Sequence, residues 1–153
     1  MKALTLWQPW ATLIAIGAKG IETRSWFTHY RGPLAIHAAK TFWGEDRRRC
    51  FLPPFSTVLA AHDLTPDILP LGKIVCLASL DDCIETRAVN LTEITENEQA
   101  FGDFSWGRFA WFLAEIQGLP NPVPARGARR LWPVEWSEAR AVYRELKMKA
   151  EAR

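Results

Sequence analysis

The sequence predicts one α+β domain in which about six strands and two to four helices enclose a single core. A length of 153 residues fits one domain, and a hydrophobic content of 48% is ordinary for a globular protein. Strand-like alternation and helix-like three-four spacing both occur along the chain, whereas repeats and low-complexity linkers do not. We therefore expect residues 1–153 to fold as a single domain.

The first forty residues predict three strands and one short helix. Pro9 suits the first position of a helix, and Gly17 suits a left-handed cap at the end of that helix. In the strand that follows, Glu22, Arg24 and Trp26 occupy alternate positions and share one face. The three predicted strands are Lys2 to Leu6, Ile21 to Trp26 and Leu34 to Ala38.

The rest of the chain predicts an insertion, three more strands and a terminal helix. Prolines divide residues 44–70 into two short helical pieces, either packed over a barrel mouth or lying loosely on the surface. The proline-rich segment 120–124 is expected to be irregular. A three-four apolar stripe of Trp136, Ala139, Tyr143, Leu146 and Ala150 predicts an amphipathic helix over about 137–150. The expected strands are Lys73 to Ser79 or as far as Glu85, Arg108 to Ile116, and Leu131 to Val134, which would close the barrel.

Charge is unevenly distributed, although the net charge is only +2. Residues 1–49 hold eight Lys/Arg against three Asp/Glu, residues 50–100 hold two against eight, and residues 101–153 hold nine against six. The two ends of the chain are therefore basic and the middle is acidic. If the ends meet in space, they form one basic face.

Several classes of protein are not indicated. The three cysteines lack metal-binding spacing, and no nucleophile elbow, zinc-protease, P-loop or dinucleotide motif occurs. The apolar start resembles a signal peptide, but Gln8 and Pro9 interrupt it, and no run is long enough to span a membrane. We expect a cytoplasmic protein without metal or cofactor, and a monomer by default.

The segment Gly17 to Arg24 reads G-x-K-x-x-E-x-R, and this spacing resembles the signature of the ASCH domain family. Further family-like motifs occur in order at Leu6 to Ala11, Tyr30 to Ala38, Phe101 to Trp111, Pro122 to Gly127 and Leu131 to Trp132. The resemblance implies a PUA-like mixed β-barrel with a cleft near the first helix, lined by the strand from Lys19 to Arg24. It also implies binding of RNA or of a nucleotide or nucleoside ligand.

Three residues of the signature are the main candidates for this cleft. Lys19 would bind a phosphate or, if burial lowers its pKa, assist chemistry; otherwise it is a solvated turn lysine. Glu22 would accept a hydrogen bond from a base or ribose, and Arg24 would grip a phosphate or orient Glu22. The plain alternative for Glu22 and Arg24 is a surface ion pair worth about 0.5 kcal/mol.

Other candidates are weaker. Trp10 or Trp26 could stack on a base, whereas Trp111 and Trp132 are expected in the core. His37 is either a satisfied interior histidine or a ligand donor or base. The remaining candidates for binding are Arg31, Lys40, Ser105, Arg108 and Arg126, with the clusters Arg47–Arg49 and Arg126/Arg129/Arg130 as phosphate-steering groups.

Three functions remain open at this point. The first is a module that binds RNA or a nucleotide. The second is a metal-independent hydrolase, a ribonuclease or an amidohydrolase on a modified nucleoside, with Lys19 and Glu22 as catalytic residues. Amidohydrolase relatives use a lysine, a threonine and a later glutamate; Lys19 matches the first, but Glu22 stands in the place of the threonine. The third is a protein-interaction module that uses the C-terminal helix.

Overall fold

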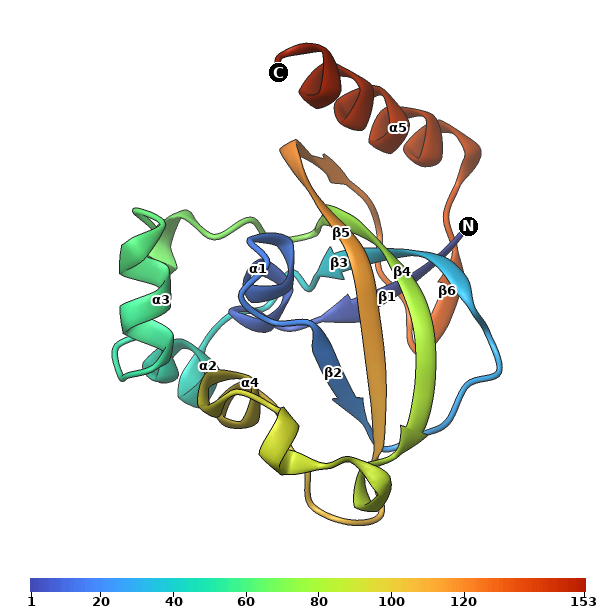
Figure 1. The fold of residues 1–153 in the computed structure, drawn as a ribbon. Coiled ribbons are helices and arrows are strands. Elements are labelled where there is room, and N and C mark those ends of the chain that lie inside the picture. The colour runs from blue at the N-terminus through green and yellow to red at the C-terminus, as the bar shows by residue number, and fades with distance from the viewer.

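The computed structural model describes residues 1–153 and is built on one mixed, curled sheet (Figure 1). The strand order is β2-β5-β4-β3-β1-β6. Only β1 and β3 run parallel; every other neighbouring pair is antiparallel. The six strands confirm the predicted α+β class, and their bounds are β1 Lys2–Leu6, β2 Ile21–Arg24, β3 Gly32–Ala38, β4 Lys73–Glu85, β5 Phe109–Pro124 and β6 Leu131–Pro133.

The sheet curls into a half-barrel, and its two edge strands do not pair with each other. β6 (Leu131–Pro133) pairs only with β1, and β2 (Ile21–Arg24) pairs only with β5. The expectation that the last strand closes the barrel is therefore wrong. No strand bridges β6 and β2, and an opening is left between the two edges.

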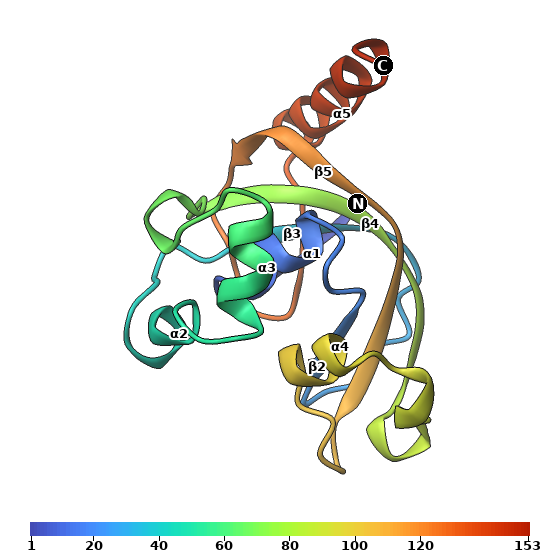
Figure 2. The same cartoon turned by 60° about the vertical axis from the view of Figure 1, so that its left-hand side comes forward.

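Short helices fill and flank the curled sheet (Figure 2). α1 packs inside the curl, where Ala11, Leu13 and Ile14 are fully buried. Gly17 has φ of +79°, so it ends this helix in the left-handed conformation that glycine tolerates. The helices are α1 Trp10–Ala15, α2 Gly44–Arg49, α3 Phe55–Ala61, α4 Glu96–Phe101 and α5 Trp136–Glu151, with 3₁₀ turns at Pro66–Ile68, Thr86–Ala88 and Leu91–Glu93.

The segment 44–70 is packed rather than loose. Its apolar side chains form a small core with α1 and α4, in which Leu59 is 1% exposed. The buried members of this core are Leu13, Cys50, Phe55, Leu59, Leu69 and Phe101. Because Leu13 belongs to α1 and Phe101 to α4, the segment holds two elements of the cleft described below in place.

Two details of the sequence-based interpretation are wrong. Segment 120–124 belongs to β5, and its last two residues, Val123 and Pro124, pair with Ile74 and Lys73 of β4. The prolines occupy alternate positions, so the amide of Val123 between them remains available. In α5, Val142 is the fully buried residue, whereas Trp136 and Tyr143 are 76% and 51% exposed. The buried face thus overlaps the predicted stripe only in part: Leu146 packs against the same cluster as Val142, but the face follows the contact with β5 and leaves the two largest apolar residues outside.

Buried aromatic and sulfur groups agree with the expected core. Trp111 is 0% and Trp132 is 6% exposed, as predicted. All three cysteines are buried free thiols, and burial raises the pKa of Cys50 to about 11. No helix is both long and apolar enough to cross a bilayer.

Candidate functional site

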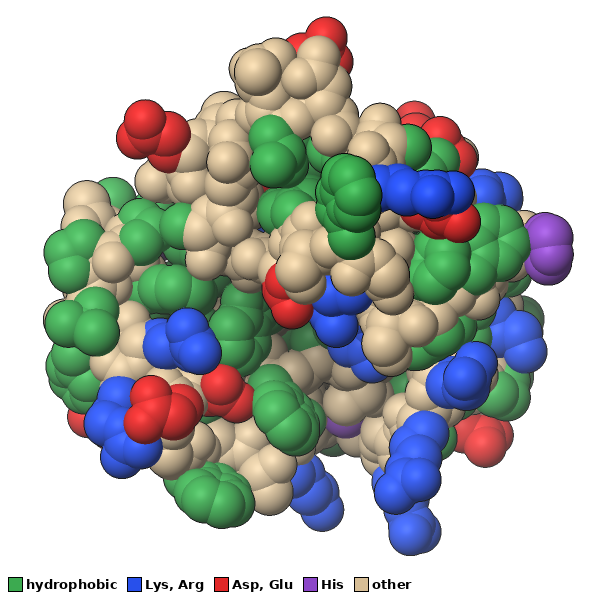
Figure 3. All heavy atoms as spheres, turned by 90° about the horizontal axis from the view of Figure 1, so that it is seen from below, with side chains coloured by type: hydrophobic (Ala, Val, Ile, Leu, Met, Phe, Trp, Pro, Cys, Tyr) green, Lys and Arg blue, Asp and Glu red, His purple; other side chains and the backbone are tan.

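A cleft of about 640 Å³ opens where the two edges of the sheet face each other. Its walls come from the end of β1, from β2, from the residues around α4 and from the segment that leads into β6. The face in Figure 3 is hollowed at its centre, with Lys and Arg side chains and apolar side chains around the hollow. The lining residues that carry charge or an aromatic ring are Trp7, Trp10, Glu22, Arg24, Trp26, Arg49, Phe55, Phe101, Asp103, Arg108, Arg129 and Arg130.

Hydrogen bonds to residues in and just after α4 hold both ends of β2, the strand that carries Glu22 and Arg24. The Glu98 carboxylate, at the start of α4, accepts from Gly20 N at 2.9 Å and from Ile21 N at 3.0 Å. Asp103 N donates to Thr23 Oγ1 at 3.0 Å, just beyond the end of the same helix. Glu98 thus ties α4 to the beginning of β2; both of its oxygens accept from the backbone, and it does not line the cleft.

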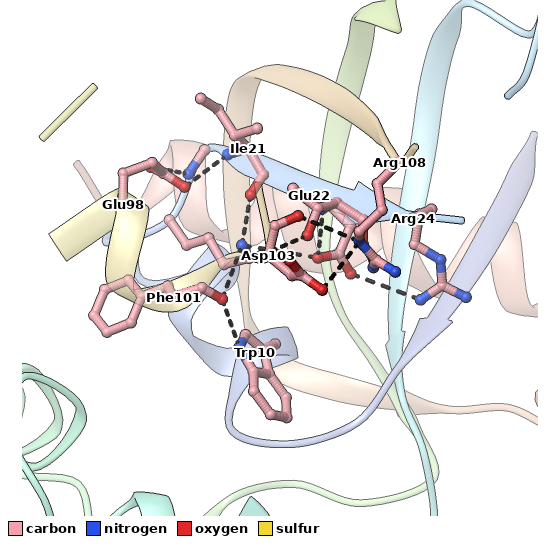
Figure 4. Close-up of polar contacts among 11 residues, drawn as sticks. Trp10, Ile21, Glu22, Arg24, Glu98, Phe101, Asp103 and Arg108 are labelled. Atoms are coloured by element: carbon pink, nitrogen blue, oxygen red, sulfur yellow. Dashed lines mark hydrogen bonds and ion pairs between the residues drawn. The ribbon is translucent and has the colours of Figure 1, made fainter. Parts of the chain in front are cut away.

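Lys19 does not reach over the cleft, contrary to expectation. Its side chain is fully buried, and Nζ donates to Ile21 O at 2.5 Å and lies 3.5 Å from Phe101 O (Figure 4). Nζ also lies 3.7 Å from Glu22 Oε1. Buried ammonium groups need such partners, because an unpaired buried charge is costly. Lys19 therefore contacts Glu22 from the protein interior, on the side away from the cleft, and joins β2 to α4.

Glu22 lies between two cations at the wall of the cleft. Oε1 faces Lys19, Oε2 lies 3.8 Å from Arg24 Nη1, and Thr23 N donates to Oε1 at 3.1 Å (Figure 4). The Glu22 side chain is only 9% exposed, whereas that of Arg24 is 28% exposed. The three signature residues thus converge as expected, but only Glu22 and Arg24 line the cleft.

Arg108 and Asp103 form a second ion pair on the wall, with Nε 3.4 Å from Oδ2. Arg108 Nη2 also donates to Thr23 O at 3.1 Å, so its guanidinium joins β5 to β2. Two hydrogen bonds from Ser105, from its hydroxyl and its amide, lower the pKa of Asp103, and Arg108 adds to this shift. Ser105 does not line the cleft; its hydrogen bonds favour the ionised form of Asp103 and fix its orientation.

Aromatic rings form the floor and rim of the cleft. Trp10 is anchored, because its Nε1 donates to Phe101 O at 2.7 Å. Trp26 packs edge-on against Trp111 at 4.7 Å, and the Arg130 guanidinium lies 4.8 Å from the Trp26 ring centroid. Trp7, for which no role was predicted, lines the cleft with 61% of its surface exposed. Trp7 directly follows the first strand and lies within the family-like motif Leu6 to Ala11, and this was the available signal.

Comparison with known proteins agrees with this architecture. The sequence model of the ASCH domain matches residues 4–123. The chain belongs to the ASCH domain family. Crystal structures of ASCH from Zymomonas mobilis and of two of its single-residue mutants match with a TM-score of 0.56 at 12–14% identity, and cover 94% of this chain and 93–96% of theirs. At this identity the likeness shows the fold alone.

Longer proteins also contain a similar ASCH domain. Activating signal cointegrator 1 of Homo sapiens and of Mus musculus are each 26% identical over 133 and 136 residues, 86% of this chain. The present chain spans 22% of the length of these relatives. The helix α5 lies beyond the residues that the family model matches.

A second hollow of this ASCH domain, which we call the groove, has a volume of about 880 Å³ and adjoins the cleft. His37, Lys40 and Arg126 lie here and not in the cleft. His37 Nε2 donates to Ala125 O at 2.7 Å, and Thr5 Oγ1 lies 3.2 Å from Nδ1. Both ring nitrogens are therefore occupied, and His37 acts as a satisfied interior histidine and not as a ligand donor.

Arg31 lies outside both hollows. Its guanidinium donates to Thr28 O at 2.8 Å and lies 3.7 Å from Asp82 Oδ1, so it braces the turn before β3 (Gly32–Ala38). Arg31 precedes β3 and His37 lies near the end of that strand, so the two are separated by its length. No group of three His, Cys, Asp or Glu side chains is arranged to hold a metal ion.

Proposed function

We propose that the cleft of this ASCH domain binds a short segment of single-stranded RNA. The observation that carries the proposal is the combination of five arginines with three tryptophans around one opening. Arginine pairs bidentately with phosphate, and an exposed indole ring such as that of Trp7 stacks on a base at about 1–3 kcal/mol. A volume of about 640 Å³ lies within the range of sites that hold small organic ligands, and so accommodates one or two nucleotides at a time.

The balance of charge supports an anionic ligand. The two carboxylates of the lining, Glu22 and Asp103, are each paired with an arginine. Three further arginines of the lining, Arg49, Arg129 and Arg130, have no ion-pair partner. The phosphodiester backbone of RNA supplies the partners that these guanidinium groups lack.

Glu22 allows the cleft to recognise hydrogen-bond donors of the ligand in addition to its phosphate charge. Its carboxylate is held rigidly between Lys19 and Arg24 and accepts hydrogen bonds only. A ribose 2′-hydroxyl or the amino group of a base is a suitable donor. Deoxyribose lacks this hydroxyl, so we expect the cleft to prefer RNA over DNA of the same sequence.

The test is titration of the protein with a fluorescent single-stranded RNA at several salt concentrations. Arg24→Ala and Arg130→Ala should each weaken binding and reduce the slope of log K against log salt by about 0.7. The matched control is Arg87→Ala, which removes one exposed positive charge that lines neither hollow. Equal losses in Arg87→Ala and Arg24→Ala, or no binding by the wild-type protein, would overturn the proposal.

A hydrolase using the same cleft is the second candidate, and Glu22 is the observation that favours it. A carboxylate at the wall of a cleft, oriented by two cations, can act as a general base. Lys19 is not available as a nucleophile, because it is buried and donates to a carbonyl. Cleavage of RNA in the presence of a chelator, lost in Glu22→Gln, would support this function; RNA that stays intact would exclude it for that substrate.

The outer face of α5 favours a third candidate, an interaction with another protein. Trp136, Tyr143 and Met148 are each more than half exposed. Deleting the helix is a poor test, because Val142 packs into the core beneath β5. The double substitution Trp136→Ala/Tyr143→Ala leaves that packing in place, and it should abolish partner capture without changing RNA affinity if α5 serves this function.

A further inference from the structure

The charged residues that line the groove beside the cleft are all positive. Lys40, Arg126 and Arg129 are exposed in its lining, and no Asp or Glu lines it. None of the three forms an ion pair within the protein. In the cleft, by contrast, two of the five arginines are already paired with carboxylates. The groove therefore has a larger share of its cations free to meet an anion.

The wall of the groove is a fixed part of the fold. Trp132 Nε1 donates to Thr5 Oγ1 at 3.0 Å, and His37 links Thr5 to the carbonyl of Ala125. Gly127 packs so closely on this chain of hydrogen bonds that an added Cβ would lie 2.8 Å from both Thr5 Oγ1 and His37 Cε1. Arg126 and Arg129 thus project from a segment that is anchored to the sheet.

Lys40 is held on the opposite wall. Gly72 has φ of +65°, and a Cβ at that position would lie 3.0 Å from Lys40 Cγ. The absence of a side chain at Gly72 lets the Lys40 stem lie along the backbone. An ammonium placed in this way loses less side-chain entropy when it binds than a freely rotating lysine does.

The cleft and the groove share Thr5, Ala128 and Arg129 in their linings. We propose that the groove binds the phosphodiester backbone of the RNA strand as it leaves the cleft, so that one strand crosses the segment Ala128–Arg129 and engages both hollows. This inference rests on the proposed function of the cleft. It adds a path for the strand to that function: nucleotides in the cleft stack and are recognised, and the phosphates beyond them are held by Lys40, Arg126 and Arg129.

The test compares a dinucleotide, which the cleft can hold alone, with a ten-nucleotide RNA that can extend into the groove. We expect Lys40→Ala/Arg126→Ala to weaken binding of the longer RNA about tenfold and to lower its salt slope by about 1.4, the value for two lost phosphate contacts. Binding of the dinucleotide, measured by NMR titration, should stay within twofold of the wild type. The control is Arg48→Ala/Arg87→Ala, which removes two exposed charges outside both hollows.

The outcomes separate the two proposals. If the wild-type protein binds neither RNA, the function proposed for the cleft fails, and the inference fails with it. If the dinucleotide binds but the ten-nucleotide RNA binds no more tightly, or if the Lys40/Arg126 variant matches the control, the inference alone is wrong. An equal loss for both RNAs in the Lys40/Arg126 variant also overturns it, because the groove would then not act separately from the cleft.

Discussion

Replacing Lys19 with methionine tests whether this residue supports the site or touches the ligand. Met fills a similar volume but carries no charge, so the substitution removes the donor to Ile21 O and one of the two cations beside Glu22. Glu22 keeps Arg24 at 3.8 Å, and Phe101 O keeps its hydrogen bond from Trp10. The damage is therefore confined mainly to one charge-assisted hydrogen bond.

Loss of such a bond costs about 1.5–3 kcal/mol. In a domain of this size 1 kcal/mol corresponds to roughly 2–4 °C, so Lys19→Met should lower Tm by roughly 3–12 °C. Arg24 is the matched control, because it touches the same carboxylate but is 28% exposed. We expect Arg24→Ala to change Tm by less than Lys19→Met does and to weaken RNA binding more.

Thermal unfolding and RNA titration of Lys19→Met and Arg24→Ala together decide whether Lys19 stabilises the fold or contacts the ligand. The reasoning fails if Lys19→Met unfolds at the wild-type temperature while its RNA affinity falls as far as that of Arg24→Ala. That result would mean that Lys19 leaves the interior and contacts the ligand, as its motif position first indicated.

Three further predictions concern the framework of the site. Gly127→Ala should cost about 1–3 kcal/mol in unfolding free energy through overpacking against His37, and it should weaken binding of long RNA as the segment shifts. Burial lowers the pKa of His37 below 6.5, so the unfolded chain binds a proton at a higher pH than the folded protein does. The contribution of His37 to the free energy of unfolding should therefore be fully present above pH 6.5 and should fall as the pH drops toward the lower folded pKa. Urea unfolding at pH 7.5 and 5.5 should show this loss, and the loss should be smaller in His37→Gln. Leu59→Ala, in the packed insertion, should cost about 2–5 kcal/mol, whereas Leu52→Ala at 62% exposure should change stability by less than about 0.5 kcal/mol; equal effects would contradict the packing described.

Local pattern predicted the strands and helices well because these depend on near neighbours. The alternation of Glu22, Arg24 and Trp26 placed all three on the wall of one cleft, as the structure shows. The same reasoning failed for segment 120–124, where three prolines argued against a strand. Pairing of Val123 and Pro124 with β4 (Lys73–Glu85) overrides that local signal at the end of the segment, because the alternate prolines leave the amide of Val123 available.

Sequence by itself determined the family, the fold class and the group of signature residues, since these follow from spacing along the chain. Only the tertiary structure decided which of those residues faces solvent. Lys19 and Arg24 are both cations near Glu22, yet a lysine that follows a helix end can point inward or outward with the same spacing. Ile21 O, two positions away, accepts from Nζ at 2.5 Å, but α4 adds Phe101 O at 3.5 Å from 82 positions away in sequence, and this distant segment helps to keep the side chain inside. The separation of the groove from the cleft likewise arises from contacts between distant segments, which no local pattern records.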